Sequence, residues 1–173
     1  LMAEGLDVRL LEIDVADEES VRRAAETVAS ETGVLHVLVN NAGVILDRTR
    51  PPSEARIEDI KATFEVNLYG PIRVTQAFLP LLQQAKAGRI VNVSSILGSQ
   101  TLHADPASGI YDMKVPAYNA SKAAVNSWTL ALAHELRNTP IKVNTVHPGY
   151  VKTDMNGGHG EIEIAEGARS SVQ

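Results

Sequence analysis

A tyrosine and a lysine four residues apart are the side chains whose types and spacing best suit chemistry in this sequence. Tyr118 and Lys122 stand in the run Tyr-Asn-Ala-Ser-Lys, shortly after Pro116. Proline is favoured in the first turn of a helix, and a spacing of four places both side chains on one helix face. An ammonium group near a phenol favours the phenolate and lowers the phenol pKa from about 10. Such a phenol can exchange a proton with a carbonyl or alcohol oxygen, although the pair taken alone also suits an ordinary helix surface.

Two further polar residues could assist at the same oxygen. Ser95 closely follows an apolar run, residues 89–93, and its hydroxyl could steady a carbonyl oxygen; a turn-forming serine is the alternative. Asn67 lies within a helical pattern, and Pro71, four residues on, has no N–H to donate to the Asn67 carbonyl. That carbonyl would then be free to bind water, or the proline simply kinks the helix. The sequence does not choose between these two alternatives.

The pattern of apolar residues predicts the elements that must position these side chains. Short apolar runs predict strands, and runs with helical spacing predict helices. Because the two alternate, the fold class is α/β, with a parallel sheet and helices on both of its faces. The predicted strands are 8–15, 34–39, 89–93 and 141–146. One predicted helix begins at Asp17, a second runs from about 57 to 84 with an interruption at 70–71, and two more cover 116–137 and 163–172. A long loop is predicted at 96–115.

Polar residues follow the predicted strands at the edge where such sheets bind their ligands, beyond the carboxyl ends of the strands. These residues are Asp14, Asn40, Asn41, Ser94, Ser95 and the turn Pro148-Gly149. The small residues of Asn40-Asn41-Ala42-Gly43 would let the backbone approach a ligand closely, although any fold of this class needs a turn there. Four polar strand ends at one edge predict a single functional crevice.

The composition excludes several classes of protein and of site. The 173 residues carry a net charge of −5 and no cysteine. A mildly acidic chain without a basic run is poorly suited to nucleic acid, and the lack of cysteine excludes disulfides and thiolate metal sites. No apolar run approaches the roughly 20 residues of a membrane span, and the five histidines lack the spacing of metal ligands. We therefore expect a cytoplasmic protein with no metal site and with neither nucleic acid nor membrane as a partner.

Taken in their order along the chain, these motifs closely resemble those of the short-chain dehydrogenase/reductase family. The motifs are Asp14-Val15, Asn40-Asn41-Ala42-Gly43, Asn67, Ser95, Tyr118 with Lys122, and the run from Pro148 to Thr153. The resemblance covers nearly the whole chain, and the long loop before Tyr118 makes it most similar to carbonyl-reductase-type members. It implies a Rossmann-like fold and the transfer of a hydride between a nicotinamide cofactor and a small-molecule substrate. The substrate would be a ketone or aldehyde and its alcohol. The cofactor would be NADP or NAD, with NADP slightly favoured.

The same resemblance implies a role for each matching residue. Tyr118 would be the general acid/base, and Lys122 would lower its pKa and hold the nicotinamide ribose. Ser95 would position the substrate, and Asn67 would anchor a proton-relay water. The implied cofactor-binding residues are Asp14 at the adenine amino group with Val15 beside it, Asn41 at the adenosine ribose, Tyr118 and Lys122, and Val151 and Thr153 at the nicotinamide carboxamide.

The sequence departs from the family at both of its ends. The family's first strand, its Gly-rich pyrophosphate turn, its second strand and its last strand have no counterpart in residues 1–173. We therefore expect a single partial Rossmann-like domain, incomplete at both ends, that binds cofactor weakly by itself. In the family's strand order, a gap would separate the strand at 8–15 from the other three. That strand should be displaced, pair in another way, or depend on another chain.

Two rival functions and one partner remain open from the sequence. A sugar-nucleotide epimerase or dehydratase would use the same tyrosine and lysine, but its larger C-terminal region does not fit the short family-like ending. A non-catalytic fragment or pseudoenzyme on the same scaffold would explain the missing pyrophosphate turn. A homodimer could form through the helices that carry Asn67 and Tyr118, as in many relatives. Substrate contacts are expected in the loop 96–115 and in the segment 156–166.

Overall fold

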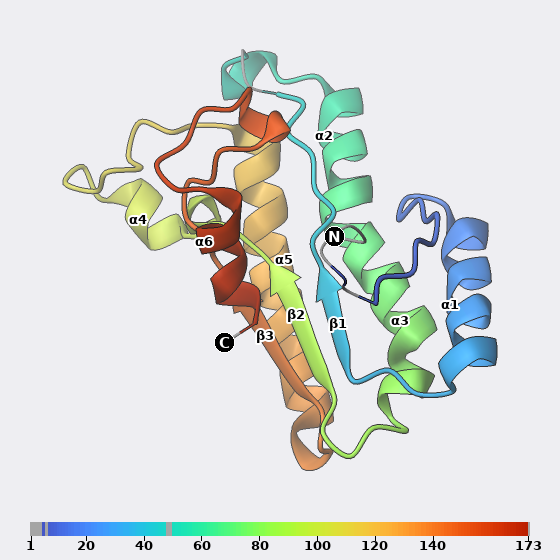
Figure 1. The fold of residues 1–173 in the computed structure, drawn as a ribbon. Helices are drawn as coiled ribbons and strands as arrows, with labels where there is room; N and C mark the ends of the chain where they lie inside the picture. The colour runs from blue at the N-terminus through green and yellow to red at the C-terminus, as the bar shows by residue number, and fades with distance from the viewer. Residues whose placement is uncertain (1–4, 6, 48–49, 173) are drawn as a thin grey trace.

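Three parallel strands in the order β1-β2-β3 form the sheet (Figure 1). The computed structural model describes residues 5, 7–47 and 50–172. The strands are β1 (Val37–Asn40), β2 (Arg89–Val93) and β3 (Lys142–Val146). In the register, Asn40 lies opposite Asn92, which lies opposite Thr145, so the three strands end at nearly the same level. The last three predicted strands are confirmed, and the first of them is shifted toward Asn40.

Helix α1 (Glu18–Thr32) begins and ends where its sequence places a cap. The Asp17 side chain accepts a hydrogen bond from the Glu19 N–H, and acidic residues occupy the first turn, where the helix dipole favours negative charge. Gly33 closes the helix at φ 66°, a left-handed conformation that glycine adopts without steric cost. This helix is confirmed from cap to cap.

A π-helical turn, Glu65–Tyr69, joins α2 (Ile57–Phe64) to α3 (Gly70–Leu82). The sequence predicts one helical stretch interrupted at 70–71, and the structure places the interruption directly before Gly70-Pro71. The Gly70 N–H donates to the Glu65 carbonyl, which is the wider π pattern, and Pro71 has no N–H with which to restore the regular ladder. Asn67 therefore lies on a bulge of the helix rather than on a plain turn.

Helix α5 (Pro116–Glu135) is the longest helix and carries Tyr118 and Lys122. A 3₁₀ turn, Leu136–Asn138, follows it. The loop before α5 contains the short helix α4 (Gln100–Ala104), and the final predicted helix is reduced to α6 (Ile164–Ala168) and a 3₁₀ turn. Other 3₁₀ turns span Pro52–Glu54, Ile96–Gly98 and Asp154–Asn156.

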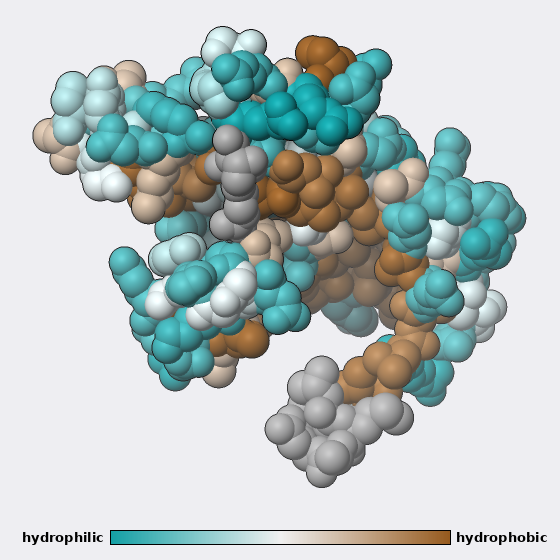
Figure 2. Space-filling model, turned by 90° about the horizontal axis from the view of Figure 1, so that it is seen from above, coloured by the Kyte–Doolittle hydropathy of each residue, from teal (hydrophilic) through white to brown (hydrophobic). Residues whose placement is uncertain are grey.

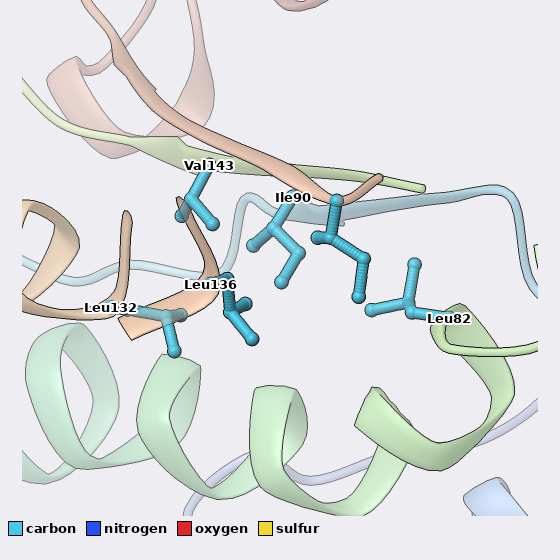
Figure 3. Packing of buried hydrophobic residues seen from close by; sticks show 6 residues of the cluster. Leu82, Ile90, Leu132, Leu136 and Val143 are labelled. Atoms are coloured by element: carbon cyan, nitrogen blue, oxygen red, sulfur yellow. The ribbon is translucent and has the colours of Figure 1, made fainter. Parts of the chain in front are cut away.

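The main hydrophobic core lies between the sheet and the long helices (Figure 3). Its buried residues are Leu82, Ile90, Leu132, Leu136, Ile141 and Val143. Burying each such side chain stabilises the fold by about 1.5–3 kcal/mol. A second cluster of Val21, Ala24, Val74 and Phe78 packs α1 against α3. These contacts fix α5 and α3 to the sheet and so position what those helices carry.

Helices α3 and α5 pack against the sheet, as the α/β class predicts. In Figure 1, α5 lies behind β2 and β3, α3 stands to the right of β1 with α1 next to it, and the short α6 is drawn in front of the strands. The Rossmann-like α/β fold is therefore confirmed. On the side away from the long helices, Val37 and Val39 of β1 remain 50% and 40% exposed.

The predicted strand at 8–15 is wrong, because these residues are irregular and pair with no strand among the described residues. Leu10 is 86% exposed, and Leu11 and Ile13 are also exposed. A strand needs a neighbour whose backbone groups it can bond, and nothing in the described chain stands at the free edge of β1 in register with this run. The segment is therefore displaced from the sheet, which is one of the three outcomes expected for it.

Candidate active site

Tyr118 and Lys122 lie on one side of the first turns of α5. The Lys122 Nζ is 5.6 Å from the centroid of the Tyr118 ring. Both residues are buried, Tyr118 to 8% exposure and Lys122 to 4%. A buried cation at this distance interacts with a phenol far more strongly than it would in water.

Burial changes the acidity of Lys122. Desolvation lowers its pKa from 10.5 to about 8, because the protein interior disfavours the charged form. The Nζ donates a hydrogen bond to the Val93 carbonyl at 2.8 Å, at the carboxyl end of β2. At neutral pH the side chain is therefore still an ammonium, held at the end of the strand that precedes Ser94 and Ser95.

Asn67 connects the π turn to the turn that carries Tyr118. Its Oδ1 accepts from the Val44 N–H at 2.8 Å, and its Nδ2 donates to the Val44 carbonyl and to the Ser121 Oγ, both at 3.0 Å. The Ser121 hydroxyl in turn donates to the Tyr118 carbonyl at 2.8 Å. Asn67 and Ser121 are almost fully buried. The side chain of Asn67 thus has a positioning role that the sequence pattern did not indicate.

Gly43 is the point at which several of these groups meet. A Cβ built on it would lie 3.5 Å from the Asn67 Oδ1, 3.6 Å from the Lys122 Nζ and 3.8 Å from the Met155 Cε. The loop after β1, the π turn, α5 and the segment after β3 therefore converge here. These groups therefore meet at the edge formed by the carboxyl ends of the strands, where a parallel sheet brings such residues together.

Ser95 reaches the same edge at the end of β2. It is half-buried, and its Oγ accepts from the Leu97 N–H at 3.1 Å, which leaves the hydroxyl proton available for donation. The neighbouring Ser94 is buried instead, with its hydroxyl donating to the Lys122 carbonyl at 3.4 Å. Gly98 lets this segment approach α5, because a Cβ there would lie 2.9 Å from the Lys122 carbonyl carbon.

Val15 and Asn41 line a separate cavity of about 290 Å³ beside β1. Its remaining lining is mostly apolar and comes from the N-terminal residues, β1 and α3. The Arg73 guanidinium donates to the Val15 carbonyl at 2.5 Å, and a Cβ on Gly70 would lie 2.8 Å from the Val15 side chain. Asp14 is exposed, and its Oδ1 accepts from the Ala16 N–H. Figure 2, seen from above, shows apolar side chains around a hollow in the middle of this face.

Val151 and Thr153 lie in an extended stretch after Gly149, whose φ of 89° suits glycine. The Asn156 side chain holds both of them: its Nδ2 donates to the Val151 carbonyl at 2.7 Å and its Oδ1 accepts from the Thr153 N–H at 3.1 Å. Val151 also forms a single parallel bridge with Ile162. Asn156 begins the segment in which the sequence predicts substrate contacts, but its hydrogen bonds to Val151 and Thr153 were not predicted.

Asn40 lines the cavity beside β1, but its side chain is engaged in the protein interior. It is buried on the helix side of β1, where its Nδ2 donates to the Thr75 Oγ1 at 3.0 Å and to the Asn92 Oδ1 at 2.8 Å. Asn92 then donates to the Thr129 Oγ1 on α5. Strand alternation sends Leu38 and Asn40 to the helices, so Asn40 is a structural residue and Asn41 is the one that remains exposed.

Two further findings limit the classes of site. Within the described ranges, no group of three or more His, Asp or Glu side chains is placed to hold a metal ion. In the same part of the chain, no helix combines the length and the apolar character needed to cross a membrane.

Comparisons with known proteins assign the chain to a family. A family model described as short chain dehydrogenase matches residues 1–163. The chain belongs to the short-chain dehydrogenases. The resemblance of its motifs to the short-chain dehydrogenase/reductase family is thereby confirmed.

Individual relatives are longer than the matched chain. The chain is 37% identical to the short-chain dehydrogenase anuI of Penicillium roqueforti, over 93% of this chain and 65% of the relative. It is 34% identical to (+)-neomenthol dehydrogenase of Arabidopsis thaliana, over 94% of this chain and 71% of the relative. A putative oxidoreductase of Mycobacterium tuberculosis is matched over 50% of its length. This dehydrogenase chain therefore spans about half to seven tenths of the curated relatives it matches.

Solved structures of reductases and dehydrogenases share the fold of this chain. The NADPH-bound carbonyl reductase from chicken fatty liver has a TM-score of 0.86 and 26% identity, over 97% of this chain and 69% of that one. A short chain dehydrogenase from Burkholderia cenocepacia in complex with NADP has a TM-score of 0.73 and 37% identity, over 92% of this chain and 60% of that one.

Proposed function

We propose that the full-length protein transfers a hydride between a nicotinamide cofactor and a ketone or aldehyde and its alcohol. The observation that carries the proposal is the buried pair on α5, with the Lys122 Nζ 5.6 Å from the Tyr118 ring centroid. The relatives reported above are dehydrogenases and reductases, which favours this reaction over a sugar-nucleotide epimerase or dehydratase.

Tyr118 is the proposed general acid/base. In reduction, its hydroxyl gives a proton to the carbonyl oxygen, and in oxidation the phenolate takes that proton back. The Lys122 ammonium stabilises the phenolate by its positive charge. A Lys122 pKa of about 8 keeps this ammonium charged at neutral pH. The Ser95 hydroxyl, with its proton available, would hold the same substrate oxygen. A water on the Asn67 carbonyl, as the family resemblance implies, would return protons to this group.

The residues of the chain fit a nicotinamide dinucleotide at its two ends. At the adenosine end, Val15 and Asn41 line one common cavity beside β1, and Asp14 directly precedes Val15 in the chain. The absence of a Cβ at Gly43 leaves room next to the Lys122 Nζ, and Val151 and Thr153 would hold the carboxamide end. When bound, the cofactor supplies or accepts the hydride. NADP is the favoured form, because the carbonyl reductase and the Burkholderia structure carry NADPH and NADP.

Three expectations remain predictions beside this proposal. The first is a homodimer through the helices that carry Asn67 and Tyr118, for which the exposed Leu130 on α5 and Ile57 on α2 offer apolar contact. The second is a cytoplasmic location. The third is that residues 1–173 form one partial domain.

The decisive experiment replaces Tyr118 by Phe in the full-length protein. We expect turnover of a ketone with NADPH to fall about 10²- to 10⁴-fold, because the proton donor is lost while the ring remains. NADPH affinity, measured by fluorescence titration, and the unfolding temperature should stay close to those of the parent. Tyr69→Phe removes the hydroxyl of a 48% exposed tyrosine and serves as the matched control. Undiminished turnover in Tyr118→Phe would remove Tyr118 from the mechanism.

A further inference from the structure

We propose that Asp47 positions Tyr118 by holding the first turn of α5 in place; the inference rests on the proposed function. Asp47 lies in the loop after β1 and is 2% exposed. Its Oδ2 accepts a hydrogen bond at 2.5 Å from the N–H of Ala117, a residue 70 positions away in the sequence. Ala117 directly precedes Tyr118 and is itself 2% exposed.

Helix α5 has no cap of its own at this end. Its N-cap residue, Val115, makes no side-chain capping bond, and the first turn contains no acidic residue. The first N–H groups of a helix lack partners within the helix, and Pro116 has no N–H to offer. The buried Ala117 N–H therefore depends on an acceptor from elsewhere, and a carboxylate at a helix N-terminus is favoured by the dipole. Asp47 supplies the acceptor oxygen and, as a carboxylate, the negative charge that the helix dipole favours.

The Asp47 carboxylate is buried, unlike an ordinary surface cap. Its second oxygen, Oδ1, is buried and has no hydrogen-bond partner among the described residues. A buried polar atom without a partner is destabilising, and such atoms in native proteins are rare and call for a cause. The ordinary surface cap of α1, Asp17, carries no such penalty because it is exposed.

The short segment 43–47 touches three proposed catalytic residues in succession. The room left at Gly43 borders the Lys122 Nζ, the Val44 backbone is held by the Asn67 side chain, and Asp47 holds the turn of Tyr118. On its other side, the same turn is held through the Ser121 hydroxyl, which bonds the Tyr118 carbonyl. Because a displacement of about 1 Å at a reacting group can cost about 10²-fold in rate, losing one of these supports should act on turnover.

The test uses the full-length protein with Asp47→Ala and Asp47→Asn. We expect Asp47→Ala to lower kcat about 10- to 100-fold while the KM for NADPH and for the ketone changes less than about threefold. Asp47→Asn keeps an acceptor oxygen of the same shape, so it should restore kcat to within about threefold of the parent. If Asp47→Ala does not fold, Asp47→Ser, which is too short to reach the Ala117 N–H, takes its place with the same expected loss.

Asp17→Ala is the matched control, because Asp17 also caps a helix N-terminus with its carboxylate but serves α1, which carries no proposed catalytic residue. It should lower the unfolding temperature and leave kcat unchanged. Parent-like kcat in Asp47→Ala or Asp47→Ser, an equal kcat loss in Asp17→Ala, or no recovery in Asp47→Asn overturns the inference. If Tyr118→Phe retains turnover, the proposed function is wrong. If Tyr118→Phe loses turnover but Asp47→Ala retains it, only the role of Asp47 is wrong.

Discussion

Helix α5 and the N-terminal segment, which we define as residues 7–17, both carry proposed functional residues but differ greatly in how they are held. Tyr118 and Lys122 are 8% and 4% exposed, and hydrogen bonds from the π turn, the loop after β1 and β2 reach their turns. In the N-terminal segment, Leu10 is 86% exposed and no strand pairing is present.

The difference shows what an apolar run needs in order to become part of a fold. Residues 8–15 are as apolar and β-prone as β2, but β2 has a neighbour on each side, and the segment has none. It is held by single contacts, chiefly two hydrogen bonds: the Arg73 guanidinium donates to the Val15 carbonyl, and the Asp14 N–H donates to the Ser20 hydroxyl. The proposed proton-transfer residues therefore have a rigid setting, whereas the proposed adenosine-binding residues have a loosely attached one.

The largest expected contrast between the two regions is in stability. Leu132→Ala removes a core side chain of α5 that is 7% exposed, and we expect a loss of about 2–5 kcal/mol in the free energy of unfolding. Leu10→Ala should change it by less than about 0.5 kcal/mol. Urea unfolding of residues 1–173 measures both, with Leu130→Ala, 73% exposed on the same helix, as the control. A similar loss in Leu10→Ala would mean that the N-terminal segment is packed after all.

An intermediate effect is expected from pH, through Lys122. Because burial lowers its pKa from 10.5 to about 8, the unfolded chain binds more protons than the folded chain between these two values. The free energy of unfolding should therefore rise with pH across this window, by up to about 3 kcal/mol. Lys122→Met should remove that rise, and Lys114→Met, in the exposed loop, should keep it. Equal slopes in the parent and Lys122→Met, from urea midpoints at pH 7 and 10, would contradict the prediction.

The smallest effect is expected where the N-terminal segment is attached. Arg73→Met removes the guanidinium that bonds the Val15 carbonyl and the Glu65 carboxylate, and its side chain is 23% exposed. In the full-length protein we expect NADPH to bind about 3- to 10-fold more weakly, about 1 kcal/mol, with kcat nearly unchanged. Arg56→Met, whose ion pairs are exposed and 3.8 Å or longer, is the control. A fall in kcat without a change in affinity would show that the two regions are not separable.

The sequence by itself determined the features that depend on near neighbours. The caps of α1, the shared side of Tyr118 and Lys122, and three of the strands follow from helical spacing, turn residues and apolar runs, which act over a few residues. The order of the family motifs was equally visible, so the family and its α/β class could be predicted.

Only the tertiary structure decided the features that need a distant partner. Residues 8–15 have strand-like composition but no neighbouring backbone, Asn40 turns inward to meet Thr75 and Asn92, and Asp47 bonds a helix 70 residues away. Strand pairing, burial and cross-chain hydrogen bonds join residues far apart in sequence, and no local pattern records which distant group will be present.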